Sequence, residues 1–194
     1  MALMIEGAET VVLRGVVDIW SVRGTARPTP GRLWTPESAA VDEHFHGTNL
    51  ITTAGYTALC QALVWSGLQD QASLLGLSAA NTYTFLTPLW GAVGSGTSVT
   101  PAKADTQLAV ELGRNTIGSG ASLPASSALA AATVWQFFFP QPATSWTVTE
   151  AGVFANATSA VNTGTLLNHL LITPNVVIPT TNTGVFQMSL QLGP

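Results

Sequence analysis

The sequence predicts a mainly β protein: an antiparallel β-sandwich of jelly-roll type with one amphipathic helix and an extended N-terminal arm. From about residue 83 onward, short apolar runs alternate with clusters of Gly, Pro and Asn, as in strands joined by turns. Residues 184–192 alternate polar and apolar side chains, which is typical of a half-buried strand. Charged residues make up only 8% of the chain, against about 25% in ordinary soluble proteins.

The N-terminal arm is predicted to span residues 1–47. It opens with a candidate strand over 10–20 that is rich in valine, and a Pro-rich segment follows. Pro28, Pro30 and Pro36 favour extended chain over a packed element. The arm is expected either to reach a neighbouring subunit or to lie on the surface of its own.

The second predicted domain spans 48–194. Residues 52–66 are predicted to form the helix, because Thr52 or Thr53 can cap it and its apolar residues share one broad face. The candidate strands that follow are 83–93, 107–112, 131–139, 145–155, 164–172, 175–178 and 184–192.

The distribution of charge predicts oligomerisation. Between Asn115 and Pro194 the only charged side chain is Glu150. A free monomer normally needs surface charge to stay soluble, whereas interface cores are poor in charge and rich in aromatic residues. The alternative is a monomer coated with Thr and Asn. The aromatic interface candidates are Trp20, Trp34, Trp90, Trp135, Phe137, Phe139 and Trp146.

Several classes of partner are not expected. The net charge is −4 with only six Lys and Arg residues, whereas binding to phosphates needs clustered basic residues. No run of about 18 apolar residues could span a bilayer, and no secretory signal is visible at the N-terminus. Cys60 cannot form an internal disulfide because it is the single cysteine, so we expect a buried thiol.

No motif in the sequence predicts catalysis or a cofactor. Neither a nucleophile elbow, a zinc-protease helix nor a phosphate loop is present, and His169 is expected to be a hydrogen-bonded residue of a strand or interface. Strand alternation would place Asp42, His44 and His46 on one face, which makes them weak candidates for a divalent metal. A polar strand or loop face is the alternative to that metal site.

Three charged residues of the β region are candidates for structural pairing. Glu111, Arg114 and Glu150 lie in an otherwise nearly neutral segment, and charges are usually paired where they are buried. We expect Arg114 to pair with Glu111 or with Glu150, which would fix the strand register or a subunit contact.

The order of several short motifs resembles a family of tailed-bacteriophage virion proteins of the head-decoration, head-fibre or tail-associated type. The resemblance covers about 49–192, and the N-terminal region falls outside it. Its motifs are Asn49–Gly55, Gly94–Thr97, Pro101–Leu108, Glu111, Arg114, Thr149–Phe154 and Gly164–Leu167.

This resemblance implies a non-enzymatic virion subunit made in the cytoplasm of a bacterial host. We expect a homo-oligomer, most simply a trimer, that decorates a capsid or forms the base of a head fibre. It would contact virion proteins such as the major capsid protein, but neither nucleic acid nor membrane. A tail, collar or baseplate subunit that binds a host glycan is the first alternative, and a secreted carbohydrate-binding module is the second.

Overall fold

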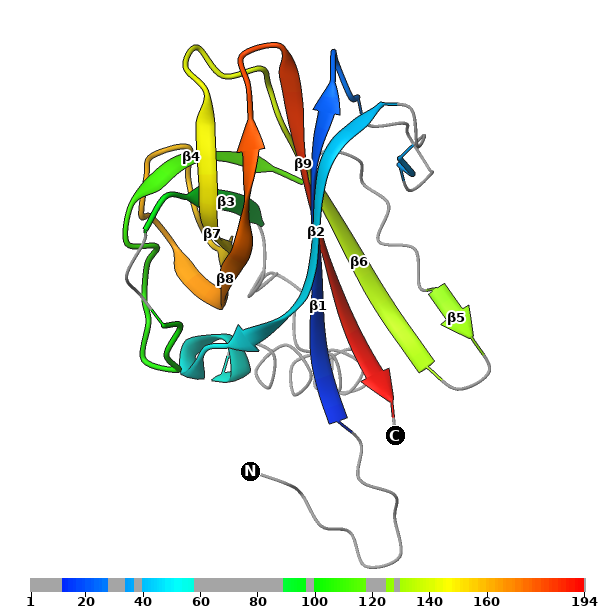
Figure 1. The fold of residues 1–194 in the computed structure, drawn as a ribbon. Coiled ribbons are helices and arrows are strands. Elements are labelled where there is room, and N and C mark those ends of the chain that lie inside the picture. The colour runs from blue at the N-terminus through cyan, green and yellow to red at the C-terminus, as the bar shows by residue number, and fades with distance from the viewer. Residues whose placement is uncertain are drawn as a thin grey trace, which may run out of the picture.

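In the computed structural model, the described residues are 12–27, 34–36, 40–57, 89–96, 100–117, 125–127 and 130–193. Within them the chain is built almost entirely from strands (Figure 1). The strands are β1 Val12–Arg23, β2 Val41–Ile51, β3 Trp90–Gly94, β4 Glu111–Thr116, β5 Ala125–Ser127, β6 Ala130–Phe139, β7 Trp146–Ala155, β8 Thr165–Ile178 and β9 Asn182–Gly193.

These strands form one sheet in the order β4-β3-β7-β8-β2-β1-β9-β6-β5, and every neighbouring pair is antiparallel. The sheet curls until β4 approaches β6, where an isolated bridge joins Ile117 to Phe137. It is therefore nearly barrel-shaped. The predicted mainly β, antiparallel fold is confirmed, while the finer jelly-roll sandwich stays a prediction.

Strand β2 links the two halves of the sheet. Most of β2 pairs with β1, and its last residues, Leu50 and Ile51, pair with His169 and Asn168 of β8. Figure 1 shows β2 curving across the molecule between these two partners. β1 lies between β2 and β9. The predicted boundary at residue 47 therefore falls inside a strand, and 12–23 and 41–47 belong to the sheet because of this long-range pairing.

The main core fills the inside of the curled sheet. Phe137, Phe139 and Phe186 lie in it with at most 1% of their surface exposed, and Trp135 joins the same cluster. Phe137, Phe139 and Trp135 are among the aromatic interface candidates, and in the single chain their β6 side chains point into this core. Trp146 packs partly against this core.

Two smaller clusters lie on the outer faces of the sheet. Trp20 belongs to one of them, with Val22, Phe138 and Val185, and Trp34 packs against it. Trp90 packs against the other, which contains Leu108 and Phe154. The aromatic interface candidates within the described residues therefore stabilise the fold of a single chain.

The predicted helix and the predicted C-terminal strands differ in part from those in the structure. Residues 53–57 are helical, and the Thr52 hydroxyl caps them by accepting the Gly55 N–H at 2.9 Å; residues 58–66 lie outside the described part. The predicted strands 164–172 and 175–178 form one strand, β8. Pro174 is tolerated there because the β7–β8 register shifts around it, so no ladder bond requires its nitrogen.

Candidate functional site

Three titratable side chains that are distant in sequence meet beside β3, β7 and β8. His169 Nδ1 lies 2.6 Å from Asp105 Oδ2, and His169 Nε2 lies 3.1 Å from Glu150 Oε2. The His169 and Glu150 side chains are each 1% exposed, and that of Asp105 is 20% exposed. We call Asp105, Glu150 and His169 the polar hub.

Glu150 is the most completely bonded member of the polar hub. Its Oε1 accepts the N–H groups of Gly96 at 3.0 Å and Val110 at 2.8 Å. Its Oε2 accepts the N–H of Ala109 at 3.0 Å, in addition to the bond with His169. These four hydrogen bonds offset the free-energy cost of removing the carboxylate from water. Glu150 therefore ties the chain on both sides of the 97–108 segment to the centre of β7.

Glycine makes this approach possible. A side chain added at Gly96 would place its Cβ 2.6 Å from Glu150 Oε1 and 2.7 Å from the Ala109 Cβ. At Gly94 the Cβ would meet the same carboxylate oxygen at 2.6 Å. Both distances are shorter than ordinary van der Waals contact. The Gly94-Ser95-Gly96 motif is thus explained by the space that Glu150 needs.

Asp105 closes the polar hub on its solvent side. Its Oδ2 accepts the Ala102 N–H at 2.7 Å as well as the bond from His169. Burial raises the pKa of Asp105, but the hydrogen bonds from Ala102 and His169 and the charge of His169 outweigh burial, so this pKa lies below its usual value. Because both acceptors are carboxylates, an imidazolium that donates from both nitrogens satisfies the whole arrangement.

A second ionic site holds the loop between β7 and β8. Arg114 forms a two-pronged pair with Glu111, with Nε–Oε1 at 2.5 Å and Nη2–Oε2 at 2.7 Å, and the two side chains are 3% and 1% exposed. Arg114 Nη1 also donates to the carbonyls of Thr158 and Thr163, and Glu111 Oε2 accepts the Asn162 N–H. Arg114 thus pairs with Glu111 rather than Glu150, and the pair secures a loop as well as β4.

The weak metal candidates do not come together as expected. His44 and His46 both contact Asp18 Oδ1 of β1, at 3.0 and 2.7 Å. Asp42 instead accepts bonds from Arg23 and Asn182, because a register shift takes Asp42 out of the ladder and breaks the alternation. Hydrogen bonds from Asn182 and then Arg23 lower the pKa of Asp42. Within the described ranges, no group of three or more His, Cys, Asp or Glu residues could hold a metal ion.

The geometry of the polar hub suits a structural clamp. Both ring nitrogens of His169 are bonded to carboxylates, so neither is free to exchange a proton with a substrate. A hollow of about 450 Å³ lies elsewhere, lined by residues that include Asn115, Phe138 and Gln141. The described tryptophans are buried or half-buried in the fold, which does not favour them as platforms for stacking sugars. No described helix has the length and apolar character needed to cross a bilayer.

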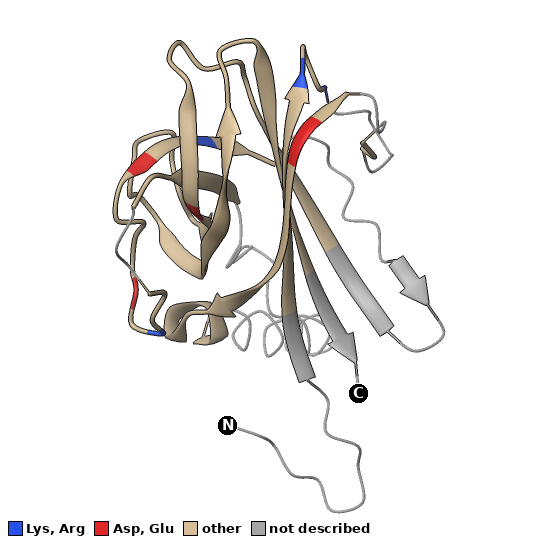
Figure 2. Ribbon diagram, in the orientation of Figure 1, with Lys and Arg blue, Asp and Glu red and all other residues tan. Residues whose placement is uncertain are grey.

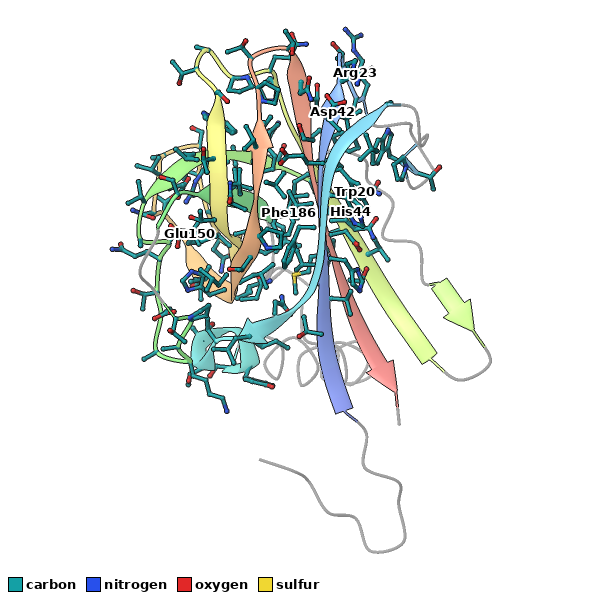
Figure 3. All side chains as sticks on the ribbon, in the orientation of Figure 1. Trp20, Arg23, Asp42, His44, Glu150 and Phe186 are labelled. Carbon is teal, nitrogen blue, oxygen red and sulfur yellow. The ribbon has the colours of Figure 1, made fainter. Side chains whose placement is uncertain are left out.

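Comparison of the chain with models of known families, with characterised proteins and with solved structures finds no match. The phage-family resemblance therefore remains a prediction. Its motifs nevertheless converge in space. Thr52 Oγ1 donates to the Leu166 carbonyl, and Thr53 N–H donates to the Lys103 carbonyl, so the capped turn joins β8 and the segment that carries Asp105. Figure 3 shows Glu150 among these elements.

Sequence reasoning did not assemble the polar hub. His169 and Asp105 are 64 residues apart in sequence, and His169 was predicted only to form a hydrogen bond within a strand or interface. One signal did point to it: Glu150 is the only charge between residues 115 and 194. A lone carboxylate within an apolar strand is stable only where hydrogen-bond donors surround it. The Gly-rich motif that supplies one of these donors, Gly96 N–H, is 54 residues away in sequence.

Proposed function

We propose that this chain is a non-enzymatic structural subunit of a bacteriophage particle that decorates the capsid surface. It assembles as a trimer and contacts neighbouring virion proteins such as the major capsid protein. Within this proposal the finer fold is a jelly-roll-like sandwich, and the loops and strand faces of its C-terminal part form the contacts. The motif order described above supports the phage assignment.

The observation that carries the proposal is the absence of charge from the described surface of the C-terminal part. Glu150 is the only charged residue after Arg114 in the sequence, and its side chain is 1% exposed. Figure 2 shows no Lys, Arg, Asp or Glu in the described parts of β6, β8 and β9. A surface without ions can be covered by a partner without the cost of desolvating charges.

Assembly through such a surface is energetically reasonable. Burying 1,000 Å² of apolar surface contributes about 25 kcal/mol at about 25 cal/mol per Å². Association costs roughly 4–15 kcal/mol in lost translational and rotational freedom, with further costs for ordering side chains. The free energies of the repeated contacts around a shell would add up, so that each subunit stabilises the position of its neighbours.

The test is the molar mass of the purified chain by light scattering over a wide range of concentrations. The expected result is a mass of three chains, together with binding to particles that lack the subunit. A monomer that stays soluble at high concentration and binds neither heads nor tails would overturn the proposal. The copy number per particle separates a decoration subunit, which covers the shell, from the alternative tail, collar or baseplate subunit, which is present in far fewer copies.

A further inference from the structure

A three-residue segment that includes Trp34 lies on the outer face of the sheet and contacts residues from two strands. Trp34 packs against the cluster formed by Trp20 of β1 with Phe138 of β6 and their neighbours. The side chain of Gln136 lies on the same outer face of β6. We call Trp20, Gln136 and Phe138 the Trp34 seat.

Gln136 recognises the main chain of Trp34. Its Oε1 accepts the Trp34 N–H at 2.9 Å, and its Nε2 donates to the Trp34 carbonyl at 2.8 Å. The same Nε2 donates to Gln187 Oε1 at 2.8 Å, which fixes the orientation of the amide. With Trp34 in place Gln136 is only 1% exposed, so both bonds form where the amide is shielded from water. The seat therefore has the hydrogen-bonding geometry of a peptide-binding site.

Two aromatic rings recognise the indole. Trp34 meets Trp20 edge to face, with centroids 5.5 Å apart, and meets Phe138 in the same manner at 6.3 Å. Such edge-to-face pairs stabilise the contact beyond the burial of apolar area alone. His44 stacks on Trp20 at 5.2 Å and helps to hold it in place. The aromatic walls and the amide together favour a tryptophan in extended chain.

The segment that occupies the seat belongs to the connection between β1 and β2. Its sequence carries Pro28, Pro30 and Pro36, a composition that favours extended chain. The described side chains of β6 and β9 on this outer face are uncharged: Val134, Gln136, Phe138, Val185, Gln187 and Ser189. Asp18 of β1 lies beside Gln187 on the same face, and it is paired with His44 and His46. A second copy could therefore approach this face without burying an unpaired charge.

We infer that, in the assembled state, the Trp34 segment of one copy occupies the Trp34 seat of a neighbouring copy. This inference rests on the proposed function, since it names the contact that links the subunits. A Trp34 segment from a neighbouring copy makes the same contacts with the seat as the segment of the same chain. Exchange between copies therefore links two subunits without the loss of any of these contacts. In the isolated chain the covalent link gives the Trp34 segment a high effective concentration at its own seat, which favours internal docking. In an assembly the seats of neighbouring copies are also at high local concentration, so internal docking loses this advantage.

The test is complementation between two variants. Trp34→Ala lacks the inserted ring but keeps the seat, and Gln136→Ala keeps the ring but lacks the amide of the seat. Each variant alone is expected to lose assembly, as measured by light scattering. An equimolar mixture is expected to recover it in part, because the Trp34 segments of Gln136→Ala subunits fill the intact seats of Trp34→Ala subunits. Thr35→Ala, at the exposed neighbouring position, is the matched control and should assemble like the wild type.

The outcomes separate this inference from the proposed function. Wild-type assembly without recovery in the mixture would overturn the exchange and leave the proposed function standing. Wild-type protein that never assembles would overturn both. Circular dichroism of each variant establishes that it is folded before it is mixed.

A second measurement keeps the inference testable if a variant is too unstable to assemble. A synthetic peptide of residues 28–40 is titrated into Trp34→Ala protein by calorimetry. The peptide is expected to bind there and to bind at least ten-fold more weakly to the Trp34→Ala/Gln136→Ala double variant. The same peptide with Ala at position 34 should not bind. Equal binding of the peptide to the single and double variants, or no binding to either, would overturn recognition in trans.

Discussion

Two carboxylates that contact histidine illustrate opposite uses of charge in this molecule. Glu150 is 1% exposed and accepts bonds from three main-chain N–H groups and His169. Asp18 is 14% exposed and contacts His44 and His46, whose side chains are 42% and 63% exposed, so the difference from Glu150 lies mainly in the exposure of the partners. Figure 3 labels Glu150 in one half of the sheet and His44 in the other. The residue types are alike, but the surroundings are not.

The comparison teaches that burial, rather than the number of bonds, decides what a polar group contributes. A buried donor or acceptor without a partner costs about 1–3 kcal/mol, and more if it is charged. An exposed ion pair contributes about 0–1 kcal/mol, because water solvates either partner when the other is removed. The polar hub should therefore make a large contribution to the free energy of unfolding, and the Asp18 site should make a small one.

Glu150→Ala is expected to cause the largest loss of stability. It leaves the N–H groups of Gly96, Ala109 and Val110 without their acceptor, and His169 loses one partner. Breaking a buried ionic site costs about 3–5 kcal/mol, which corresponds to a fall of about 10 °C in Tm for a chain of this size. Differential scanning calorimetry measures it.

Glu150→Gln is the matched control for that loss. It keeps the shape and one acceptor oxygen but turns an NH₂ group toward donors, so its loss should be about half that of the Ala variant. An Ala variant that melts within 2 °C of the wild type, roughly the effect of a surface change, would contradict the central role of Glu150.

Arg114→Ala is expected to cost slightly less, about 2–4 kcal/mol in the free energy of unfolding, because it leaves Glu111 buried without its partner. The carbonyls of Thr158 and Thr163 also lose their donor. Urea denaturation measures the loss. Removing both charges in Arg114→Met/Glu111→Leu should recover part of it, since no unpaired ion then remains. A double variant less stable than Arg114→Ala would contradict this explanation.

Much of the fold was predictable, because strands separated by Gly, Pro and Asn turns can be recognised from the local sequence. The predicted strands 131–139 and 145–155 differ from β6 and β7 by a single residue at one end. Strand alternation was considered only for residues 42–46, and the full length of β2 was not predicted, because Asp42-Glu43-His44 has little strand propensity and the strand is defined by its pairing with β1. The inward orientation of Phe137 and Phe139 also required the tertiary structure, since alternation does not reveal which face is inside.

The site was predictable only where its partners are close in sequence. Glu111 and Arg114 are three residues apart, so one of the two candidate partners of Arg114 was also its neighbour. Asp105, Glu150 and His169 come from three separate segments, and no local pattern states which of them will meet. The bulge at Asp42 likewise depends on register against β1.

The contribution of Asp105 should depend on pH. Its pKa is lowered in the folded state, so the stability that it contributes is present above the unfolded pKa, about 3.9. That contribution is lost as the pH falls through the lower, folded pKa. The difference in Tm between wild type and Asp105→Asn should therefore shrink as the pH falls below about pH 4. A difference that grows toward low pH would contradict the assigned ionised state of Asp105.

The smallest effect is expected at the exposed end of the comparison. His46→Ala removes a partner of Asp18 at 2.7 Å, but 63% of the His46 side chain is in contact with water. Water replaces the lost bond, so the free energy of unfolding should fall by less than about 1 kcal/mol at neutral pH. His44→Ala should cost more than His46→Ala, because it also removes the ring that stacks on Trp20. If urea denaturation gives His46→Ala a loss similar to that of Glu150→Ala, then burial is not what separates the two carboxylates.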